Sequence, residues 1–257
     1  SKFCLRVAKS MKGITIILAA YNEQSLITAT VEAVLEGLEC SGLDPEILVI
    51  DDCSRDGTSE FCAAASELSD SIKYIRNDVN QGFGGVYWKG ISLATKEYCM
   101  IIPGDNPVGA SGLKRMFTEV GRADIISPYV TNREVRNFGR RIVSRAYTGI
   151  LNAIMGRSLK YYCGWVIHRT ENVRHLPTIT ASFAFQAEVL CEVLRRGASI
   201  LEVGVELQEY AGRKSTAFRP KNVLGVWSTL VRLAIRRVRG RDGWPRALAP
   251  APRSLDS

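Results

Sequence analysis

The feature that most constrains this sequence is a regular alternation of short apolar runs with segments of helical periodicity. The runs are nearly continuous stretches of large apolar residues, as is typical of strands buried on both faces of a sheet. Strands are expected at Ile14–Ala20, Glu46–Asp52, Lys73–Asn77, Tyr98–Pro103, Asp124–Val130 and Ile200–Leu207. Helices are expected at Leu26–Leu38, Thr58–Leu68, Gly85–Ala94, Ser111–Val120 and Ala181–Arg195. This alternation predicts parallel βαβ units and therefore an α/β fold.

The chain is long enough for one large α/β domain. With 257 residues it can bury a substantial core, and its 23% charged and 46% hydrophobic residues are ordinary for a soluble globular protein. No apolar run approaches the roughly 20 residues that cross a bilayer, and the N-terminus lacks a signal-peptide pattern. A transmembrane protein is therefore not expected.

Cysteine and histidine usage favours reduced thiols over a zinc site. The seven cysteines form no C-x-x-C pair, and several fall inside apolar runs, as Cys99 does. This pattern is typical of core thiols in a cytosolic protein. Only His168 and His175 could assist a zinc site, and each is expected to be an ordinary surface or core polar residue.

The basic charge is concentrated near the C-terminus. Residues 211–257 hold 11 Lys/Arg against Asp242 and Asp256, a net charge of +9, whereas residues 1–210 carry −1. A basic segment suits an anionic surface such as a membrane, although a solvated tail is the simpler interpretation. The rest of the chain has no basic excess or nucleic-acid-binding motif, so nucleic acid is not expected as a partner.

Polar and glycine-rich residues follow four of the expected strands. They are Tyr21-Asn22-Glu23, Asp51-Asp52-Cys53-Ser54-Arg55-Asp56-Gly57-Thr58, Asn80-Gln81-Gly82-Phe83-Gly84-Gly85 and Gly104-Asp105-Asn106. Any one group could be a plain turn. The carboxyl ends of parallel strands meet at one edge of a sheet, where ligands bind, so the four together predict a ligand site.

The glycines after the third strand are a weak signal by themselves. They allow a close approach of the backbone to a ligand or a positive φ. A dinucleotide pyrophosphate loop would need G-x-G-x-x-G directly after the first strand. Here the glycines follow the third strand with a different spacing, which argues against a dinucleotide-binding fold.

In this order, the motifs resemble those of family 2 of the inverting glycosyltransferases. Within that family, the sequence is most similar to the dolichyl-phosphate (polyprenyl-phosphate) sugar synthases. The likeness covers roughly Ile14 to Arg232, and the Asp51–Thr58 block is its specific signal. It implies a GT-A type domain with a mostly parallel, Rossmann-like sheet flanked by helices. It also implies a nucleotide-diphosphate sugar, linked to UDP or GDP, as the donor.

The resemblance assigns donor contacts to the strand ends. Asp52 would pair with a ring N–H of the base, Tyr21 would pack beside the base, and Glu23 would hydrogen-bond the base or ribose. Ala20, Gly82 and Gly104 complete the expected nucleotide site. Simple packing is the alternative for Tyr21. Asp56 and Thr58 are expected to cap a helix instead.

Asp105 is the strongest candidate for catalysis. It stands where the family carries an Asp-x-Asp metal motif, and Mg²⁺ or Mn²⁺ there would stabilise the diphosphate as leaving group. Pro103 replaces the first Asp of that motif, and Pro107 stands where a polar ligand often follows. A metal would therefore rest on Asp105, diphosphate oxygens and water.

The second half of the chain resembles the acceptor region. If the segment is helical, five arginines share one face, which suits phosphate oxygens: Arg133, Arg136, Arg140, Arg141 and Arg145. Trp165 lies in a turn similar to the family's Ser-Gly-aromatic turn. Glu188 is expected near the acceptor, either as a general base or as a structural carboxylate that holds an arginine. Arg213 and Lys214 resemble the basic loop that closes over the diphosphate, where they would stabilise the leaving group.

The C-terminal segment is expected to form a basic amphipathic helix over Val223–Arg239. Val223, Val226, Trp227, Leu230, Val231 and Ala234 would share one face, with Arg232, Arg236 and Arg239 opposite. Such a helix can lie in a membrane interface, and docking on its own domain is the alternative. The expected organisation is an extension at 1–12, the glycosyltransferase domain at 13–221, this helix at 222–240 and a flexible tail at 241–257.

The sequence therefore predicts an inverting glycosyltransferase with a polyprenyl-phosphate acceptor. A phosphate is already a nucleophile, which agrees with the lack of an obvious catalytic base. A cytoplasmic protein, peripheral on the inner face of the membrane, is expected. Two alternatives stay open. One is a saccharide or other hydroxyl acceptor, with Glu188 as base. The other is a sugar-nucleotide binding module without turnover, because Pro103 replaces the first Asp of the metal motif.

Overall fold

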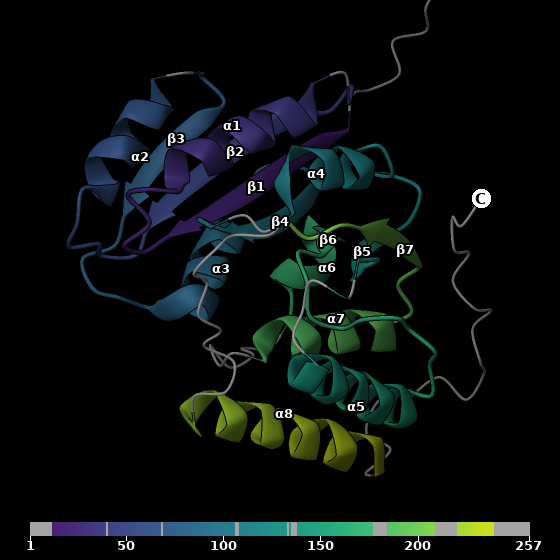
Figure 1. Cartoon of the computed structure of the whole chain (residues 1–257). Coiled ribbons are helices and arrows are strands. Elements are labelled where there is room, and N and C mark those ends of the chain that lie inside the picture. Colours follow the sequence, from purple (N-terminus) through teal and green to yellow (C-terminus); the bar gives the residue numbers. More distant parts are fainter. Residues whose placement is uncertain are drawn as a thin grey trace, which may run out of the picture.

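A computed structural model describes residues 12–39, 41–67, 69–105, 108–132, 134, 138–176, 184–208 and 220–238, without the side chains of 220–224 and 238. It contains a sheet of seven strands flanked by helices (Figure 1). The strands are β1 (Gly13–Ala20), β2 (Asp44–Asp51), β3 (Ile72–Arg76), β4 (Tyr98–Pro103), β5 (Ile125–Val130), β6 (Ile167–Arg169) and β7 (Ile200–Val205). The helices are α1 (Ile27–Leu38), α2 (Thr58–Ser66), α3 (Gly82–Leu93), α4 (Gly109–Phe117), α5 (Phe138–Met155), α6 (Thr170–Arg174), α7 (Phe185–Arg195) and α8 (Pro220–Val238).

The sheet has the order β3-β2-β1-β4-β6-β5-β7, and all neighbours pair in parallel except β6. The expected α/β architecture with a mostly parallel sheet is confirmed, and so are the six expected strands. Because β6 is antiparallel to both β4 and β5, those two strands run in the same direction. The carboxyl ends of β1, β2, β4 and β5 therefore lie at one edge of the sheet.

The core is divided by the sheet into two apolar layers. Alternate residues of β1 point to opposite faces: Ile17 packs among side chains of α3, α5 and α7, whereas Ile16 and Leu18 pack among those of α1, α2 and α4. A Cβ on Gly90 would lie 2.5 Å from the Ile17 side chain, so a glycine is needed there for α3 to approach β1. Apolar side chains cover both faces of the sheet, which explains why the strands are nearly continuous apolar runs.

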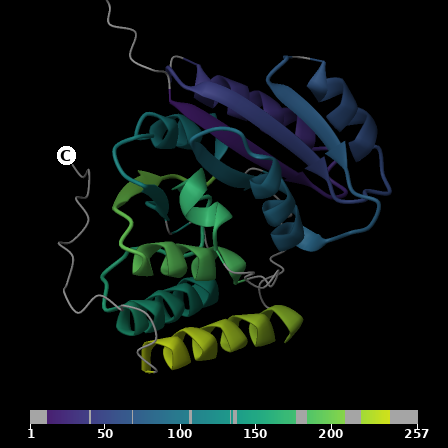
Figure 2. The same cartoon turned by 180° about the vertical axis from the view of Figure 1, so that it is seen from behind.

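Beyond the first layer of helices, α5 and α8 add a further one. Figures 1 and 2 show these two helices side by side, on the side of the molecule away from β2, β3 and α2. The α5 helix was predicted only on the condition that its arginine-rich segment was helical, and β6 and α6 were not predicted. Among the described helices, none is long and apolar enough to span a membrane.

The described cysteines form no disulfide with one another, as expected: Cys53, Cys62, Cys99, Cys163 and Cys191. Burial raises the pKa of both Cys62 and Cys99 to about 12, so these thiols are unreactive core residues. His168 is also a core residue: it lies on β6, and burial lowers its pKa to about 3.

Candidate active site

The loops that follow β1, β2 and β4 meet at the carboxyl edge of the sheet. The backbone N–H of Asp52 donates to the carbonyl of Ala20, and that of Gly104 donates to the carbonyl of Ala19, each at 2.8 Å. A Cβ on Gly104 would lie 3.0 Å from the Glu23 side chain and 3.2 Å from the Ala19 carbonyl oxygen. The sequence therefore brings Ala20, Glu23, Asp52 and Gly104 together, as predicted.

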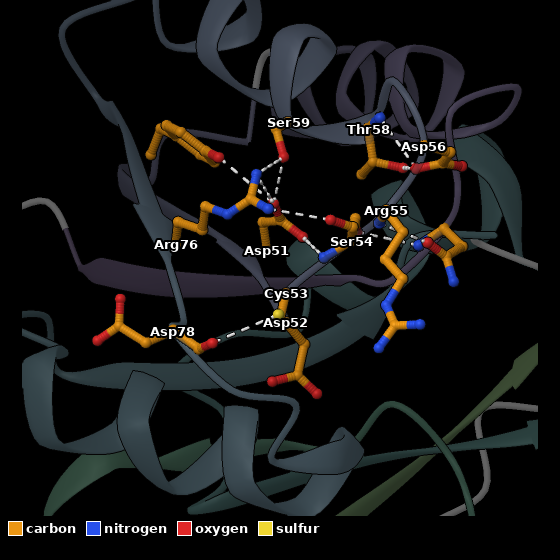
Figure 3. Close-up of polar contacts among 12 residues, drawn as sticks. Asp51, Asp52, Cys53, Ser54, Arg55, Asp56, Thr58, Ser59, Arg76 and Asp78 are labelled. Carbon is orange, nitrogen blue, oxygen red and sulfur yellow. Dashed lines mark hydrogen bonds and ion pairs between the residues drawn. The ribbon is translucent and has the colours of Figure 1, made fainter.

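The two aspartates after β2 have different roles, and Figure 3 shows their side chains pointing in opposite directions. Asp51 is fully buried and accepts hydrogen bonds from the Ser54 N–H at 2.9 Å and the Ser59 hydroxyl at 2.7 Å, with the Arg76 guanidinium 3.4 Å away. Burial opposes ionisation of Asp51, but these hydrogen bonds outweigh it and lower its pKa. Asp51 is thus a structural anion that holds the start of α2.

Asp52 points toward the loop between β3 and α3 instead. Its carboxylate accepts from the Asn77 side-chain amide at 2.8 Å, from the Gln81 N–H at 2.8 Å and from the Gly82 N–H at 2.7 Å. Gly82 has a φ of +72°, a value that residues with a side chain rarely adopt. In this conformation its N–H points toward the Asp52 carboxylate. The glycine-rich loop is therefore organised around Asp52, a contact that the sequence did not predict.

The Tyr21-Asn22-Glu23 segment is tied to the block after β2. The N–H of Asn22 donates to the Ser54 hydroxyl at 3.0 Å, and the N–H of Glu23 donates to the Thr58 hydroxyl at 2.9 Å. These bonds leave the Tyr21 ring 45% exposed, so it is accessible to a planar ligand. Its position allows the predicted packing beside a base.

Two non-glycine residues at this edge adopt positive φ. They are Asn22, at +54°, and Cys53, at +65°, in the adjacent loops after β1 and β2. Asn tolerates this conformation, whereas it strains Cys. Such strain is maintained only where surrounding contacts fix the backbone, and it often marks a functional loop.

Asp56 has the structural role that was expected. Its carboxylate accepts from the Thr58 N–H at 3.0 Å, at the first residue of α2, and from the Gln24 N–H at 3.4 Å. The Thr58 hydroxyl, together with these backbone donors, lowers the pKa of Asp56. It links the first two strand-end loops.

Asp105 follows β4 at the same edge and is half-buried. Within the described part of the chain, no three His, Cys, Asp or Glu side chains gather into a metal-binding group. A divalent ion that used this edge would take one carboxylate from the protein and its other oxygens from a bound diphosphate and water. Mg²⁺ often binds in this way, so Asp105 fits such an ion.

A cavity of about 280 Å³ lies farther along the edge, next to the carboxyl end of β5. It is lined by Val130, Arg141, Ser144, Arg145, Thr148, Gly149, Asn152, Lys160 and Tyr161. Three of these residues are cations and none is acidic. The Nε of Arg141 is buried and meets no hydrogen-bond acceptor in the described part of the chain. The cavity therefore offers positive charge and hydrogen-bond donors to an anion.

Lys160 belongs to the loop after α5, which is held on two sides. Its backbone N–H donates to the Glu202 carboxylate of β7 at 2.7 Å, and Asn152 bonds both the N–H and the carbonyl of Leu159. The Lys160 ammonium lies 4.0 Å from the centre of the Tyr129 ring, within cation–π distance. The sequence analysis missed Lys160 because no local pattern marks a lone lysine that tertiary contacts bring to α5.

The predicted acceptor residues are only partly brought together. Arg141 and Arg145 line the cavity, whereas Trp165 packs against the apolar layer of α1, α2 and α4. Arg133 and the proposed diphosphate residues Arg213 and Lys214 lie outside the described residues.

Glu188 does not line the cavity. It is 2% exposed on α7, and its carboxylate lies 3.0 Å from the Arg232 guanidinium of α8. This is the structural alternative that the sequence left open, and it corrects the placement of Glu188 at the acceptor. A buried carboxylate that is paired with an arginine is poorly placed to remove a proton from an acceptor hydroxyl.

The α8 helix was predicted correctly in type, but its arginines face the protein. Arg232 pairs with Glu188, and Arg236 lies 3.6 Å from the Glu192 carboxylate. Arg237 donates to backbone carbonyls near the end of α5. The expectation that Arg232 and Arg236 face a membrane is therefore corrected in favour of docking on the domain, and Arg239 lies outside the described residues.

A model of the family described as "Glycosyl transferase family 2" matches residues 15–173, more than half of the chain. The chain belongs to this family. The match covers the strand-end motifs on which the resemblance rested, so that part of the expectation is confirmed.

Similar curated proteins are longer than this chain. The succinoglycan biosynthesis protein ExoO of Rhizobium meliloti is 32% identical over 43% of this chain and 30% of its own length. Glycosyltransferase AglD of Haloferax volcanii is 25% identical over 85% of this chain and 36% of its own length. A poly-β-1,6-N-acetyl-D-glucosamine synthase of Staphylococcus epidermidis is 28% identical over 50% of this chain and 30% of its own length. The matches thus span about a third of each relative.

Solved structures share the fold at low sequence identity. Glucosyl-3-phosphoglycerate synthase from Mycobacterium tuberculosis, in complex with Mn²⁺, UDP-glucose and phosphoglyceric acid, gives a TM-score of 0.68 at 17% identity and covers 94% of this chain and 89% of that one. Mannosyl-3-phosphoglycerate synthase from Rubrobacter xylanophilus gives 0.64 at 16% identity and covers 93% and 77%. These similarities confirm the GT-A architecture.

Proposed function

We propose that this chain transfers a sugar from a UDP- or GDP-linked donor to a polyprenyl phosphate, with inversion at the anomeric carbon. The observation that carries the acceptor class is the cavity beside α5, which Arg141, Arg145 and Lys160 line and in which none of the described lining residues is acidic. A phosphate monoester in this cavity would be held by charge-assisted hydrogen bonds. The cavity lies at the same sheet edge as the donor motifs, because β4 and β5 run in the same direction.

The donor half of the proposal uses the strand-end residues. Asp52, which is 3% exposed and already bonded to the loop, would accept a further hydrogen bond from a ring N–H of the base, and the exposed Tyr21 would offer a face for the ring to pack against. Asp105 would hold Mg²⁺ or Mn²⁺ against the diphosphate, and the ion would neutralise charge on the leaving group. Structural neighbours were crystallised with UDP and either ion, which supports this assignment.

The reaction is a single displacement in this proposal. An oxygen of the acceptor phosphate forms a bond to the anomeric carbon as the bond from that carbon to the donor diphosphate breaks, and the nucleoside diphosphate leaves. The phosphate oxygen carries no proton that must be removed, so no general base is required. The burial of Glu188 beneath α8 agrees with this, since the strongest candidate base is otherwise engaged.

A saccharide acceptor is the second candidate function. The names of two relatives, in succinoglycan and poly-N-acetylglucosamine synthesis, favour it. A hydroxyl acceptor needs a base, however, and the lining residues that the structure describes include neither a carboxylate nor an imidazole. A structural neighbour, a glucosyl-3-phosphoglycerate synthase, was crystallised with phosphoglyceric acid, so a hydroxyl acceptor that carries a phosphate would also match the cationic cavity.

The test is a turnover assay with paired acceptors. UDP- and GDP-sugars are offered with Mg²⁺ or Mn²⁺, and the acceptor is either a short, water-soluble prenyl phosphate or the matching prenyl alcohol. We expect a glycosyl phosphate product from the phosphate alone, with release of nucleoside diphosphate. Faster glycosylation of an oligosaccharide than of the phosphate would reject the acceptor assignment. Donor binding without any transfer would support a binding module instead.

A further inference from the structure

The two outer helices leave large apolar side chains uncovered. On α8 these are Trp227, 62% exposed, Val231, 48% exposed, and Ile235, 42% exposed. Their spacing of four residues places them along one stripe of the helix. On α5 the corresponding residues are Phe138, Ile142, Val143 and Ile150. These seven are more than half of the twelve exposed large hydrophobic side chains in the described part of the chain, so the exposure is concentrated here.

This apolar face is fixed to the domain and does not result from a loosely attached helix. Leu230 and Leu233 of α8 are 8% and 2% exposed and pack into the core layer that also holds Leu151 of α5. The ion pairs of Arg232 and Arg236 with α7 hold the same helix from its other side. Because those arginines are engaged, the outward surface of α8 is defined by Trp227, Val231 and Ile235.

The charge around this face is positive on balance, although Arg232 and Arg236 pair with Glu188 and Glu192 of α7. The sequences of α5 and α8 contain no Asp or Glu, but they contain Arg140, Arg141, Arg145, Lys221, Arg232, Arg236 and Arg237. A rigid apolar face within a basic surround is complementary to an anionic phospholipid bilayer. A second protein copy would instead have to bring these like charges together across a shared interface.

We propose that the α5–α8 face, defined by Phe138, Ile142, Ile150, Trp227, Val231 and Ile235, docks on an anionic bilayer surface. The apolar side chains enter the headgroup region, and the net positive charge of α5 and α8 provides the charge attraction. The α5 helix also lines the cationic cavity with Arg141, Ser144 and Arg145, so docking brings that cavity to the membrane surface. The membrane surface would then meet the proposed acceptor site, although lipid binding itself does not depend on the proposed function.

The exposed apolar side chains of α8 can be replaced without breaking its ion pairs, whereas its paired arginines cannot. Replacement of Arg232 would remove its ion pair with the buried Glu188 and is expected to reduce stability, so it is a poor probe of lipid binding. The triple replacement Trp227→Ser, Val231→Ser and Ile235→Ser changes only exposed positions. Phe61→Ser on α2 is the matched control, because Phe61 is 41% exposed and lies in the helix layer on the other side of the sheet.

The experiment is co-sedimentation of the full chain with vesicles of phosphatidylcholine alone or mixed with phosphatidylglycerol, over a salt series. We expect wild type and Phe61→Ser to bind the anionic vesicles, less strongly as salt rises, and the triple variant to bind at least about tenfold more weakly. Ile142→Glu provides an independent change on α5 and should weaken binding as well. Circular dichroism and melting temperature establish that each variant is folded.

Wild-type protein that stays in the supernatant with anionic vesicles would overturn the proposal, and so would unchanged binding by both the triple variant and Ile142→Glu. A dimer in light scattering that the triple variant abolishes, without lipid binding, would reassign the face to self-association. Vesicle binding requires no donor or acceptor, so failure of the turnover assay leaves this result interpretable.

Discussion

At the carboxyl ends of β1, β2 and β4, motif side chains are bonded to neighbouring loops, whereas the cavity beside α5 is lined by Arg141, Arg145 and Lys160. Asp51 and Asp52 each accept several hydrogen bonds from other segments. The Arg141 Nε instead has no acceptor in the described part of the chain. The comparison indicates that the donor edge is preorganised by internal bonds, while the cavity keeps at least one buried donor, the Arg141 Nε, that a bound anion would satisfy.

Asp105→Asn should have the largest effect, because Asp105 is the carboxylate proposed to hold the metal ion at the donor edge. We expect turnover to fall by roughly 10²–10³-fold or more, the scale on which loss of charge stabilisation acts in transfer reactions. The measurement is steady-state release of nucleoside diphosphate, with and without chelator. Asp78→Asn, an exposed carboxylate beyond β3, is the matched control and should retain turnover. Full activity in excess chelator would remove the metal from the proposal.

Arg141→Gln and Lys160→Gln test whether the cavity binds the acceptor separately from the donor edge. Each should raise KM for a prenyl phosphate by about 10–100-fold, as expected for loss of one charge-assisted hydrogen bond, and should leave the Kd of the nucleotide unchanged. Kinetics and calorimetry on the same preparations separate the two effects. Arg115→Gln on α4 is an exposed arginine control. An equal loss of nucleotide affinity would show that the cavity and the donor edge form a single anion site.

Replacing the two adjacent aspartates separately tests the division of roles after β2. Asp52→Asn should weaken nucleoside diphosphate binding by about tenfold, because a charged acceptor for the base is lost. Asp51→Asn should lower the free energy of unfolding by about 1–3 kcal/mol, because it disturbs a buried, hydrogen-bonded carboxylate. Calorimetric titration and denaturant unfolding distinguish these outcomes. Unchanged affinity in Asp52→Asn would assign that residue to loop organisation alone.

The smallest expected effect concerns His168, which lies between the two regions. Burial lowers its pKa from 6.5 to about 3, so the unfolded chain binds the proton more readily than the folded one. The stabilisation is complete above pH 6.5 and is lost as the pH falls from there toward 3, by about 1 kcal/mol between pH 7.5 and 5.5. Urea unfolding at both pH values measures it, and His168→Leu should have a weaker pH dependence. Equal slopes for both proteins would contradict the linkage.

The donor half was largely predictable because its signals are local in sequence. Asp52, Glu23 and Gly104 each follow directly from a buried strand, and the sheet brings strand ends together without further information. The second half combines segments that are distant in the chain. Lys160 reaches α5 through Asn152 and Glu202, and Arg232 turns toward Glu188 of α7, which no periodicity within either helix specifies. Amphipathic spacing predicted the α8 helix, but it could not distinguish which apolar side chains pack inward.

The short β6 strand determines how these two regions are held together. It is only three residues long and supplies the hydrogen-bonded link between β4 and β5. Arg169 lies within 3.2 Å of both Glu97, before β4, and Asp124, before β5, and so contacts both neighbours at once. A shift of one residue would turn His168 to the opposite face of the sheet and break this bridge. Arg169 thus fixes the register of β6 against both neighbouring strands. The spacing between the proposed donor and acceptor sites would then depend on the three residues of β6, which lie outside both sites.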